Sequence, residues 1–263
     1  MFKKNPFGHY LILKKWLIRI MGCMSHRRYR GFNQLQVVGS EVIRQLPENN
    51  VLFVSNHQTY FADVVAMFHV FNASLSGRND SIKNIGYIWS PKLNIYFVAA
   101  KETMKAGILP RILAYAGSIS IERTWRAKGV DIKRQVKMSD ISSIGKALDD
   151  GWVITFPQGT TTPFKPLRKG TAHIIKRYKP VVVPIVIDGF RRSFDKKGIR
   201  IKKRGILQSI EIKTPLKIDY DKESVDSIIK KIEYAIEQHS SFLKVIPKDE
   251  LENQEQLNKK REW

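Results

Sequence analysis

A histidine and an aspartate stand where a strand is expected to give way to a helix. Residues 51–54 are β-branched, aromatic or otherwise apolar, follow a turn-like Pro-Glu-Asn-Asn sequence, and predict a buried strand. His57 follows this strand directly after Asn56, and a helical pattern of apolar residues begins at about Asp63. Because such loops line the ligand crevice of α/β sheets, His57 is a candidate for acid–base chemistry with a carboxylate close by. The alternative is that an imidazole beside an asparagine only satisfies backbone groups in a turn.

The rest of the chain alternates between strand-like and helix-like patterns. Strands are expected at residues 35–39, 51–55, 96–100, 117–122, 152–156, 181–187, 206–213 and 217–220, and helices at 63–70, 108–116, 141–148, 171–178 and 224–242. This alternation predicts an α/β fold with a mixed, mostly parallel sheet covered by helices. Nothing divides the chain internally, so residues 31–246 are expected to form one domain, and the charged residues 247–263 a flexible tail.

The charge of the chain is strongly positive. Its 263 residues contain 46 Lys and Arg against 24 Asp and Glu, a formal net charge of +22. Such an excess predicts an anionic partner, either nucleic acid or an anionic membrane surface. Cys23 is the only cysteine and the six histidines are scattered, so neither a thiolate cluster nor paired metal ligands can be recognised. No metal site is predicted.

The N-terminal residues 1–30 have the composition of a membrane-surface segment. Residues 7–24 are rich in apolar and aromatic side chains but are interrupted by Lys14, Lys15 and Arg19, and no apolar run reaches the ~20 residues that cross a bilayer. A basic stretch, residues 26–30, follows at once. We expect an amphipathic, basic helix that lies in an anionic membrane interface. The alternative is a helix packed against the protein's own body.

Four short motifs, in order along the chain, resemble the sequence blocks of a known enzyme family. They are Asn56-His57 with Asp63, the segment from Gly117 to Arg123, Phe156-Pro157-Gln158-Gly159-Thr160, and Val183-Pro184-Ile185. Together they resemble the glycerolipid acyltransferases, in particular the lysophosphatidate (1-acyl-glycerol-3-phosphate) acyltransferase family. The resemblance spans residues 35–187 and includes Lys169-Gly170 after the third block. Any one block is a weak signal, whereas four blocks in order are a strong one.

The resemblance implies an acyltransferase in phospholipid biosynthesis that moves a fatty acyl group to the free hydroxyl of a lyso-lipid. In that reading His57 is the general base and Asp63 fixes its tautomer. Acceptor-binding residues would be Arg123, Gln158, Gly159, Thr160 and Lys169. The donor would be acyl-CoA or acyl carrier protein, with no other cofactor. We expect a membrane-associated protein on the cytoplasmic face.

Two departures from the family pattern bear on the histidine–aspartate dyad and on the acceptor. Five residues separate His57 from Asp63 where the family usually has four, which on a continuous helix would rotate the carboxylate by about 100°. In the third block, Gln158 replaces a glutamate and Thr161 an arginine. These changes leave open a lyso-aminolipid acceptor, or an inactive membrane-bound family member. A nucleic-acid-binding protein is a further alternative, which the charge alone supports.

Overall fold

Seven strands form one sheet at the centre of the protein. The computed structural model describes residues 3–104, 112, 114–122, 126–127, 130–131 and 138–243. The sheet contains β1 (Gln34–Val38), β2 (Val51–Ser55), β3 (Ile95–Ala100), β4 (Ser118–Ile121), β7 (Trp152–Thr155), β8 (Val181–Asp188) and β9 (Leu207–Ile212), in the order β1-β9-β8-β2-β7-β3-β4. Two short strands, β5 (Arg126–Ala127) and β6 (Val130–Asp131), pair antiparallel apart from it.

The sheet is mixed and mostly parallel, as predicted. Strands β8, β2, β7, β3 and β4 run parallel to one another, whereas β9 is antiparallel to β8 and carries the parallel edge strand β1. Every residue of β2 is buried, which agrees with its unbroken apolar sequence. Because β2, β7 and β8 are parallel neighbours, their carboxyl ends meet at one edge of the sheet. The loops that follow them are therefore brought together there.

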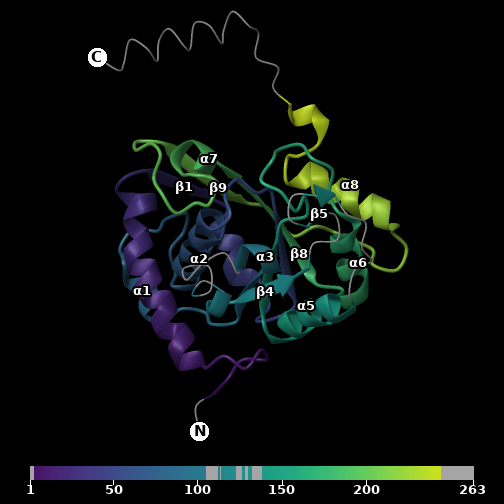
Figure 1. Ribbon diagram of the computed structural model, residues 1–263, viewed down its shortest axis with the longest axis horizontal. Helices are drawn as coiled ribbons and strands as arrows, with labels where there is room; N and C mark the ends of the chain where they lie inside the picture. The colour runs from purple at the N-terminus through teal and green to yellow at the C-terminus, as the bar shows by residue number, and fades with distance from the viewer. Residues whose placement is uncertain are drawn as a thin grey trace, which may run out of the picture.

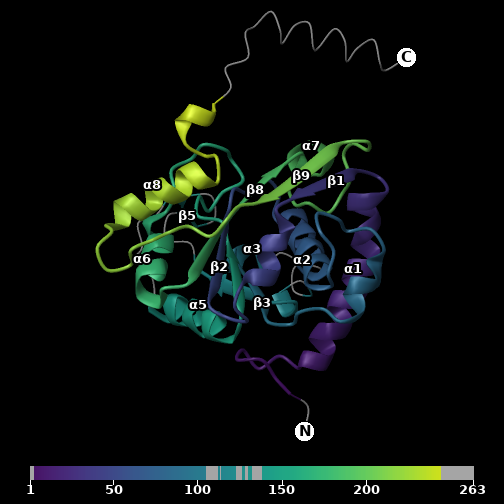
Figure 2. The ribbon, with the colours of Figure 1, turned by 180° about the vertical axis from the view of Figure 1, so that it is seen from behind.

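Helices cover both faces of the sheet. One layer contains α1 (Leu11–Arg30), α2 (Ala62–Leu75), α7 (Phe190–Ser193) and the 3₁₀ turns η1 (Ser40–Gln45) and η2 (Ile85–Trp89); the other contains α5 (Met138–Asp150), α6 (Lys169–Tyr178) and α8 (Val225–Ala235). The short α3 (Lys101–Met104) and η3 (Ser240–Phe242) complete the order. Figures 1 and 2 place α1 and α2 on one side of the strands and α5, α6 and α8 on the other.

Several predicted elements differ from the structure. Residues 217–220 are not a strand, because the chain after β9 leaves the sheet once Lys213 and Leu216 have donated backbone N–H groups to β8. The helix predicted at 224–242 ends at Ala235, where Ile236 leaves helical geometry and Glu237 has a positive φ of 56°. The N-terminal helix extends to Arg30, beyond the predicted residues 7–24. Most of the helix expected at 108–116 and the tail 247–263 lie outside the described residues.

Helix α1 packs on the domain through an unexpectedly polar face. Its buried positions are Lys14, Ile18, Gly22, Ser25 and Tyr29, of which only two are large and apolar. Its exposed positions include most of the large apolar side chains, namely Ile12, Leu13, Trp16, Ile20 and Met24, each about half exposed or more. The inward face therefore fixes α1 to the domain while the outward face leaves an apolar stripe. No helix among the described residues is both long and apolar enough to cross a membrane.

Candidate active site

The end of β2 is locked to the end of β8 by an asparagine side chain. Asn56 is buried, donates from Nδ2 to the Ile187 carbonyl at 2.9 Å, and accepts the Ile187 N–H on Oδ1 at 2.8 Å. The side chain thus takes the place of a further backbone pair in the sheet. Gln58 adds bonds to the Ile187 carbonyl at 3.2 Å and to the Asp188 carboxylate at 3.1 Å. The loop that carries His57 is therefore fixed on both sides of the histidine.

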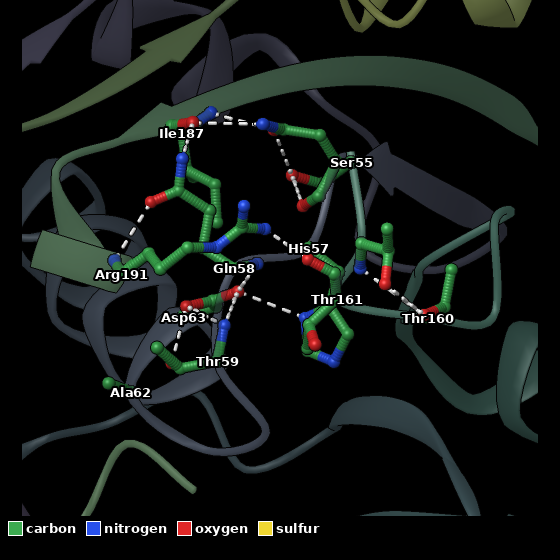
Figure 3. A network of polar contacts seen from close by, with 12 residues as sticks. Ser55, His57, Gln58, Thr59, Ala62, Asp63, Thr160, Thr161, Ile187 and Arg191 are labelled. Carbon is green, nitrogen blue, oxygen red and sulfur yellow. Dashed lines mark hydrogen bonds and ion pairs between the residues drawn. The ribbon is translucent and has the colours of Figure 1, made fainter. Parts of the chain in front are cut away.

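His57 and Asp63 are in direct contact. The His57 Nδ1 lies 2.9 Å from Asp63 Oδ2, and the carboxylate is fully buried. Asp63 also accepts the backbone N–H of Gln58 at 2.6 Å, the backbone N–H of Thr59 at 3.0 Å and the Thr59 hydroxyl at 2.6 Å. Because all of these groups donate, Asp63 accepts from Nδ1–H, which leaves Nε2 as the basic nitrogen of a neutral imidazole. Figure 3 shows the opposite edge of the ring pointing away from Asp63.

The loop between β2 and α2 accommodates the extra residue that separates His57 from Asp63. Asp63 is the second residue of α2, so the rotation expected on a continuous helix does not arise. Tyr60 and Phe61 donate their backbone N–H groups to successive carbonyls of residues 196–197, each at 3.1 Å. Gly198, with φ +76°, lies so close that a Cβ there would come within 2.6 Å of the Ala62 nitrogen. The basic loop after α7 thus supports the histidine loop from outside.

Phe156, the residue after β7, covers one face of the imidazole. Its ring lies 3.9 Å from the His57 ring centroid at an interplanar angle of 20°. The His57 side chain retains 13% of its exposure, so a ligand can still approach it. Stacking restricts ring rotation, and together with the Asp63 bond it fixes the direction of Nε2. This places a rigid proton acceptor at the carboxyl edge of the sheet.

Gln158 is tied into the protein rather than directed at a ligand. It is buried, and its Nε2 donates to the Lys165 carbonyl and to Gln238 Oε1, each at 3.0 Å. Gln238 Oε1 also accepts the Phe164 backbone N–H at 2.9 Å. The amide therefore closes the loop of the third block and ties it to the segment after α8. The prediction that Gln158 binds the acceptor gains no support from these contacts.

The remaining residues of the third block form a turn. Gly159 donates its N–H to the Phe156 carbonyl at 2.9 Å and has φ +64°, a conformation that favours glycine. The Thr160 hydroxyl accepts the Thr162 N–H at 3.2 Å, and Thr161 is buried. Thr161 accepts a hydrogen bond from the Arg191 guanidinium on its carbonyl oxygen. Thr160 and Thr161 therefore lie beside the histidine loop, as Figure 3 shows.

Of the two cations predicted to bind the acceptor, the structure describes Lys169 but not Arg123. Lys169 begins α6 and forms an exposed ion pair with Asp226 of α8 at 2.7 Å, which lowers the Asp226 pKa. That pair links two helices on the outer layer, so an acceptor-binding role for Lys169 remains a prediction. Arg123 lies outside the described residues; β4, which precedes it, ends at Ile121 and is the third strand from β2 in the sheet.

Sequence reasoning missed several residues that build the site. Thr59 and Gln58 supply donors to Asp63, Phe156 supplies the stacking ring, and Arg191 reaches Thr161. Thr59 and Gln58 lie inside the recognised motif, so their position was a usable signal. The sequence offered no signal for Arg191, because residues 191–204 contain many cations and nothing distinguishes Arg191 from its neighbours.

An apolar cavity lies behind α2. It lies between α1, α2 and the 85–89 turn, and its empty space of about 600 Å³ includes volume that is open to solvent. Its walls include Phe61, Val64, Val65 and Phe68, on the α2 segment that begins next to Asp63. His69 also lines the cavity, and its imidazole contacts the Ser25 hydroxyl at 2.9 Å and the Tyr87 hydroxyl at 2.8 Å. Burial lowers the His69 pKa to about 3, so this group is neutral.

Among the described residues, no group of three or more His, Cys, Asp or Glu side chains is arranged to hold a metal ion. The residues with chemical capability at the sheet edge are instead the His57–Asp63 pair, the threonines of the third block and the Arg191 guanidinium. This set can accept a proton and bind an anion.

Comparisons with known proteins identify the family and a similar fold. The Acyltransferase family matches residues 34–188, which include β1 to β8 and the whole histidine loop. The chain is also similar in fold to the 1-acyl-sn-glycerophosphate (LPA) acyltransferase PlsC from Thermotoga maritima, with a TM-score of 0.55 and 19% identity over 85% of this chain and 78% of that one. A comparison with curated protein sequences finds no match. Since the family match covers more than half of the residues, the chain belongs to the acyltransferase family and is an acyltransferase.

Proposed function

We propose that this acyltransferase moves a fatty acyl group from acyl-CoA or acyl carrier protein to the free hydroxyl of a lyso-lipid, foremost 1-acyl-glycerol-3-phosphate. The observation that carries the proposal is the His57–Asp63 contact, with Nε2 directed away from the carboxylate at the edge of the sheet. The fold shared with a lysophosphatidate acyltransferase is consistent with that acceptor. That enzyme's name states the acceptor of that enzyme, and the same acceptor is proposed for this chain.

The chemistry requires only one base. His57 Nε2 takes the proton of the acceptor hydroxyl as the oxygen attacks the thioester carbonyl carbon. The carbon–sulfur bond then breaks, and the leaving thiolate takes the proton from the imidazolium. Asp63 stabilises the imidazolium and keeps the proton on Nδ1 of the neutral ring. The four hydrogen bonds that hold Asp63 keep this carboxylate in place through both steps.

The apolar cavity behind α2 suits a fatty acyl chain. Its walls are mostly aliphatic and aromatic, and two of the residues that line it, Phe61 and Val64, lie close to Asp63 in the sequence. An acyl chain inserted there gains roughly 0.8 kcal/mol for each buried methylene group. The neutral His69 and its hydrogen-bond partner Tyr87 also line the cavity, and these groups gain nothing from contact with hydrocarbon.

Membrane association is part of the proposal. The apolar stripe of α1 and the exposed Trp89 lie on either side of Arg19, whose guanidinium lies over the Trp16 and Trp89 rings at 5.0 and 5.3 Å. Exposed tryptophan with adjacent cations is the composition of segments that lie in a membrane interface. A lipid acceptor and an acyl chain would both be reached from that surface, and the proposed location is the cytoplasmic face of the membrane.

The test is turnover by purified full-length protein. The assay pairs acyl-CoA or acyl carrier protein with 1-acyl-glycerol-3-phosphate, a lyso-aminolipid and a neutral monoacylglycerol. We expect transfer to 1-acyl-glycerol-3-phosphate, and loss of at least about 10²-fold in kcat for His57→Ala with an unchanged Tm, because a loop imidazole contributes to the transition state more than to the core. Near wild-type turnover by His57→Ala would refute the mechanism. Turnover of none of the acceptors would favour an inactive family member.

A lyso-aminolipid is the second candidate acceptor. It is favoured by Thr161, which carries no charge at a position where the resembling enzymes have an arginine. The assay above separates the two, because the preferred acceptor has the larger kcat/KM. The nucleic-acid alternative is disfavoured by the family match, which accounts for the histidine loop while charge alone does not.

A further inference from the structure

The Arg191 side chain lies across the loop that carries His57. Its backbone N–H donates to Gln58 Oε1 at 3.1 Å, and its guanidinium donates to the Thr161 carbonyl. Figure 3 shows the side chain extending from α7 over Gln58 toward Thr161, with the His57 ring close by. These two contacts fix the residue at both ends. The guanidinium is therefore held between the loop after β2 and the loop after β7.

The charge of Arg191 is not neutralised within the described part of the chain. The next residue, Arg192, points elsewhere and forms an ion pair with Asp188 at 2.8 Å. No carboxylate among the described residues forms an ion pair with Arg191. A guanidinium has five N–H donors, and the bond to Thr161 leaves others for a ligand. An immobilised, unpaired cation beside a base is a site for an anionic group.

The neighbouring groups extend this site. Thr160 and Thr162 present hydroxyls on the exposed turn of the third block, 3.3 Å from each other. Thr161 stands at the position where resembling enzymes carry an arginine, and the guanidinium of Arg191 reaches that same residue from α7. A cation beside residue 161 is thus supplied from α7, which follows β8, the strand on the other side of β2 from β7. Lys169, paired with Asp226, does not supply it.

We propose that Arg191 binds the phosphate monoester of the acceptor lipid and so determines that the enzyme prefers a phosphate-bearing lyso-lipid. This rests on the proposed function for its reaction, but the binding itself requires no turnover. Two parallel N–H donors match two phosphate oxygens, and the glycerol hydroxyl of the same molecule then approaches His57 Nε2. Arg191 is accordingly an acceptor-binding residue rather than a base.

The experiment compares Arg191→Gln and Arg191→Lys with Arg192→Gln in the full-length protein. Arg191→Gln and Arg191→Lys both remove the guanidinium beside Thr161. Arg192→Gln is the control, because it removes an equal charge one residue away. We expect Arg191→Gln to raise the KM for 1-acyl-glycerol-3-phosphate about tenfold or more, with the donor KM unchanged and Arg191→Lys intermediate. Arg192→Gln should change the acceptor KM by less than about twofold. Calorimetric binding of glycerol 3-phosphate should weaken in the same order.

The outcomes separate this proposal from the proposed function. Equal effects of Arg191→Gln and Arg192→Gln would overturn it in favour of general surface charge. A raised donor KM with an unchanged acceptor KM would also overturn it, because the site would then belong to the donor. If the wild type binds glycerol 3-phosphate through Arg191 yet transfers no acyl group, the phosphate site stands and the proposed reaction fails. If the enzyme transfers acyl groups to 1-acyl-glycerol-3-phosphate with a KM that does not depend on Arg191, the proposed reaction stands and the phosphate site fails.

Discussion

The amide of Gln158 donates to the side-chain oxygen of Gln238 across 80 positions of sequence, at 3.0 Å and away from solvent. This pair joins the third block of the acyltransferase motif to the segment that follows α8. The second hydrogen of the same amide is bound by the Lys165 carbonyl. Position 158 therefore requires a side chain that donates two hydrogen bonds, which a carboxylate cannot do.

The first prediction follows from that requirement. Gln158→Glu should lower the free energy of unfolding by about 1–3 kcal/mol, because it places a carboxylate against two acceptors in a buried position. Urea denaturation of both proteins measures the difference. Thr160→Ser, on the exposed part of the same turn, is the control and should change stability little. A Gln158→Glu protein as stable as the wild type would mean that the pair with Gln238 is unimportant.

A second prediction concerns the aspartate of the histidine loop. Asp63→Asn should reduce kcat about 10²-fold or more with little change in the acceptor KM, because the neutral amide neither stabilises the imidazolium nor enforces the Nδ1–H tautomer. Steady-state kinetics measure both constants. Since the new NH₂ group also faces the Thr59 and Gln58 donors, circular dichroism and Tm must establish that the variant is folded. A small loss of kcat in a folded variant would make Asp63 a residue that only organises the loop.

The main strands and the contact between His57 and Asp63 could be predicted because their signals are local. Residues 51–54 of β2 and 181–187 of β8 are continuous apolar runs, and His57 and Asp63 lie within seven residues of one another. The contacts of Gln158 and Arg191 could not be predicted from the sequence. Each contact depends on a partner that is distant in the sequence and is brought close only by the order of strands in the sheet. Residues 217–220 have a strand-like composition, but the last backbone bonds from this segment to β8 are those of Lys213 and Leu216. After Leu216 no neighbouring strand among the described residues pairs with the chain.

The N-terminal helix shows a different limit of sequence reasoning. Composition predicts a helix, and α1 is one. Composition alone does not reveal which face is inward, since apolar residues occur all round the helix. Here Lys14, Gly22 and Ser25 face the domain because each meets a specific partner: Ser25 contacts His69, and Gly22 lies where any Cβ would collide with Ile88. Propensity and charge contain no information about these contacts.

The third prediction addresses the outward face of α1. The double variant Trp16→Ser with Ile20→Ser should bind anionic phospholipid vesicles about tenfold less tightly or weaker still, because two half-exposed apolar side chains no longer enter the interface. Sedimentation with vesicles at constant ionic strength measures the partition. Tyr234→Ser, an equally exposed side chain on α8, is the matched control and should leave binding unchanged. Equal binding by the double variant would exclude this face as the membrane contact.

Raising the ionic strength offers an independent check on the same surface. Binding through buried apolar groups is insensitive to salt, whereas attraction between cations and anionic lipid is screened over about 10 Å at 0.1 M. Binding by the wild type should therefore fall with salt to a plateau, and binding by the double variant should fall toward zero.

The last prediction concerns the pH dependence of stability. Lys14 is fully buried beneath the Tyr96 ring, with Nζ 4.5 Å from the ring centroid and 3.3 Å from the Ile95 carbonyl. Burial lowers its pKa from 10.5 to about 7, although the nearby Asp150 opposes the shift. Between these two values the unfolded chain binds more protons than the folded protein. The contribution of Lys14 to stability is therefore most favourable above about pH 10.5 and is progressively lost as the pH falls to 7.

Lys14→Met removes this titration while keeping a side chain of similar length. At pH 7 the variant should be more stable than the wild type, by about 1–3 kcal/mol, because folding of the wild type must either bury the lysine charge or release its proton, whereas methionine is apolar. The difference should shrink as the pH is raised toward 10, since the wild-type lysine is then neutral when folded. Urea denaturation at pH 7, 8.5 and 10 measures it. A variant less stable than the wild type at pH 7 would mean that the contacts of the ammonium group with Tyr96 and Ile95 outweigh its desolvation.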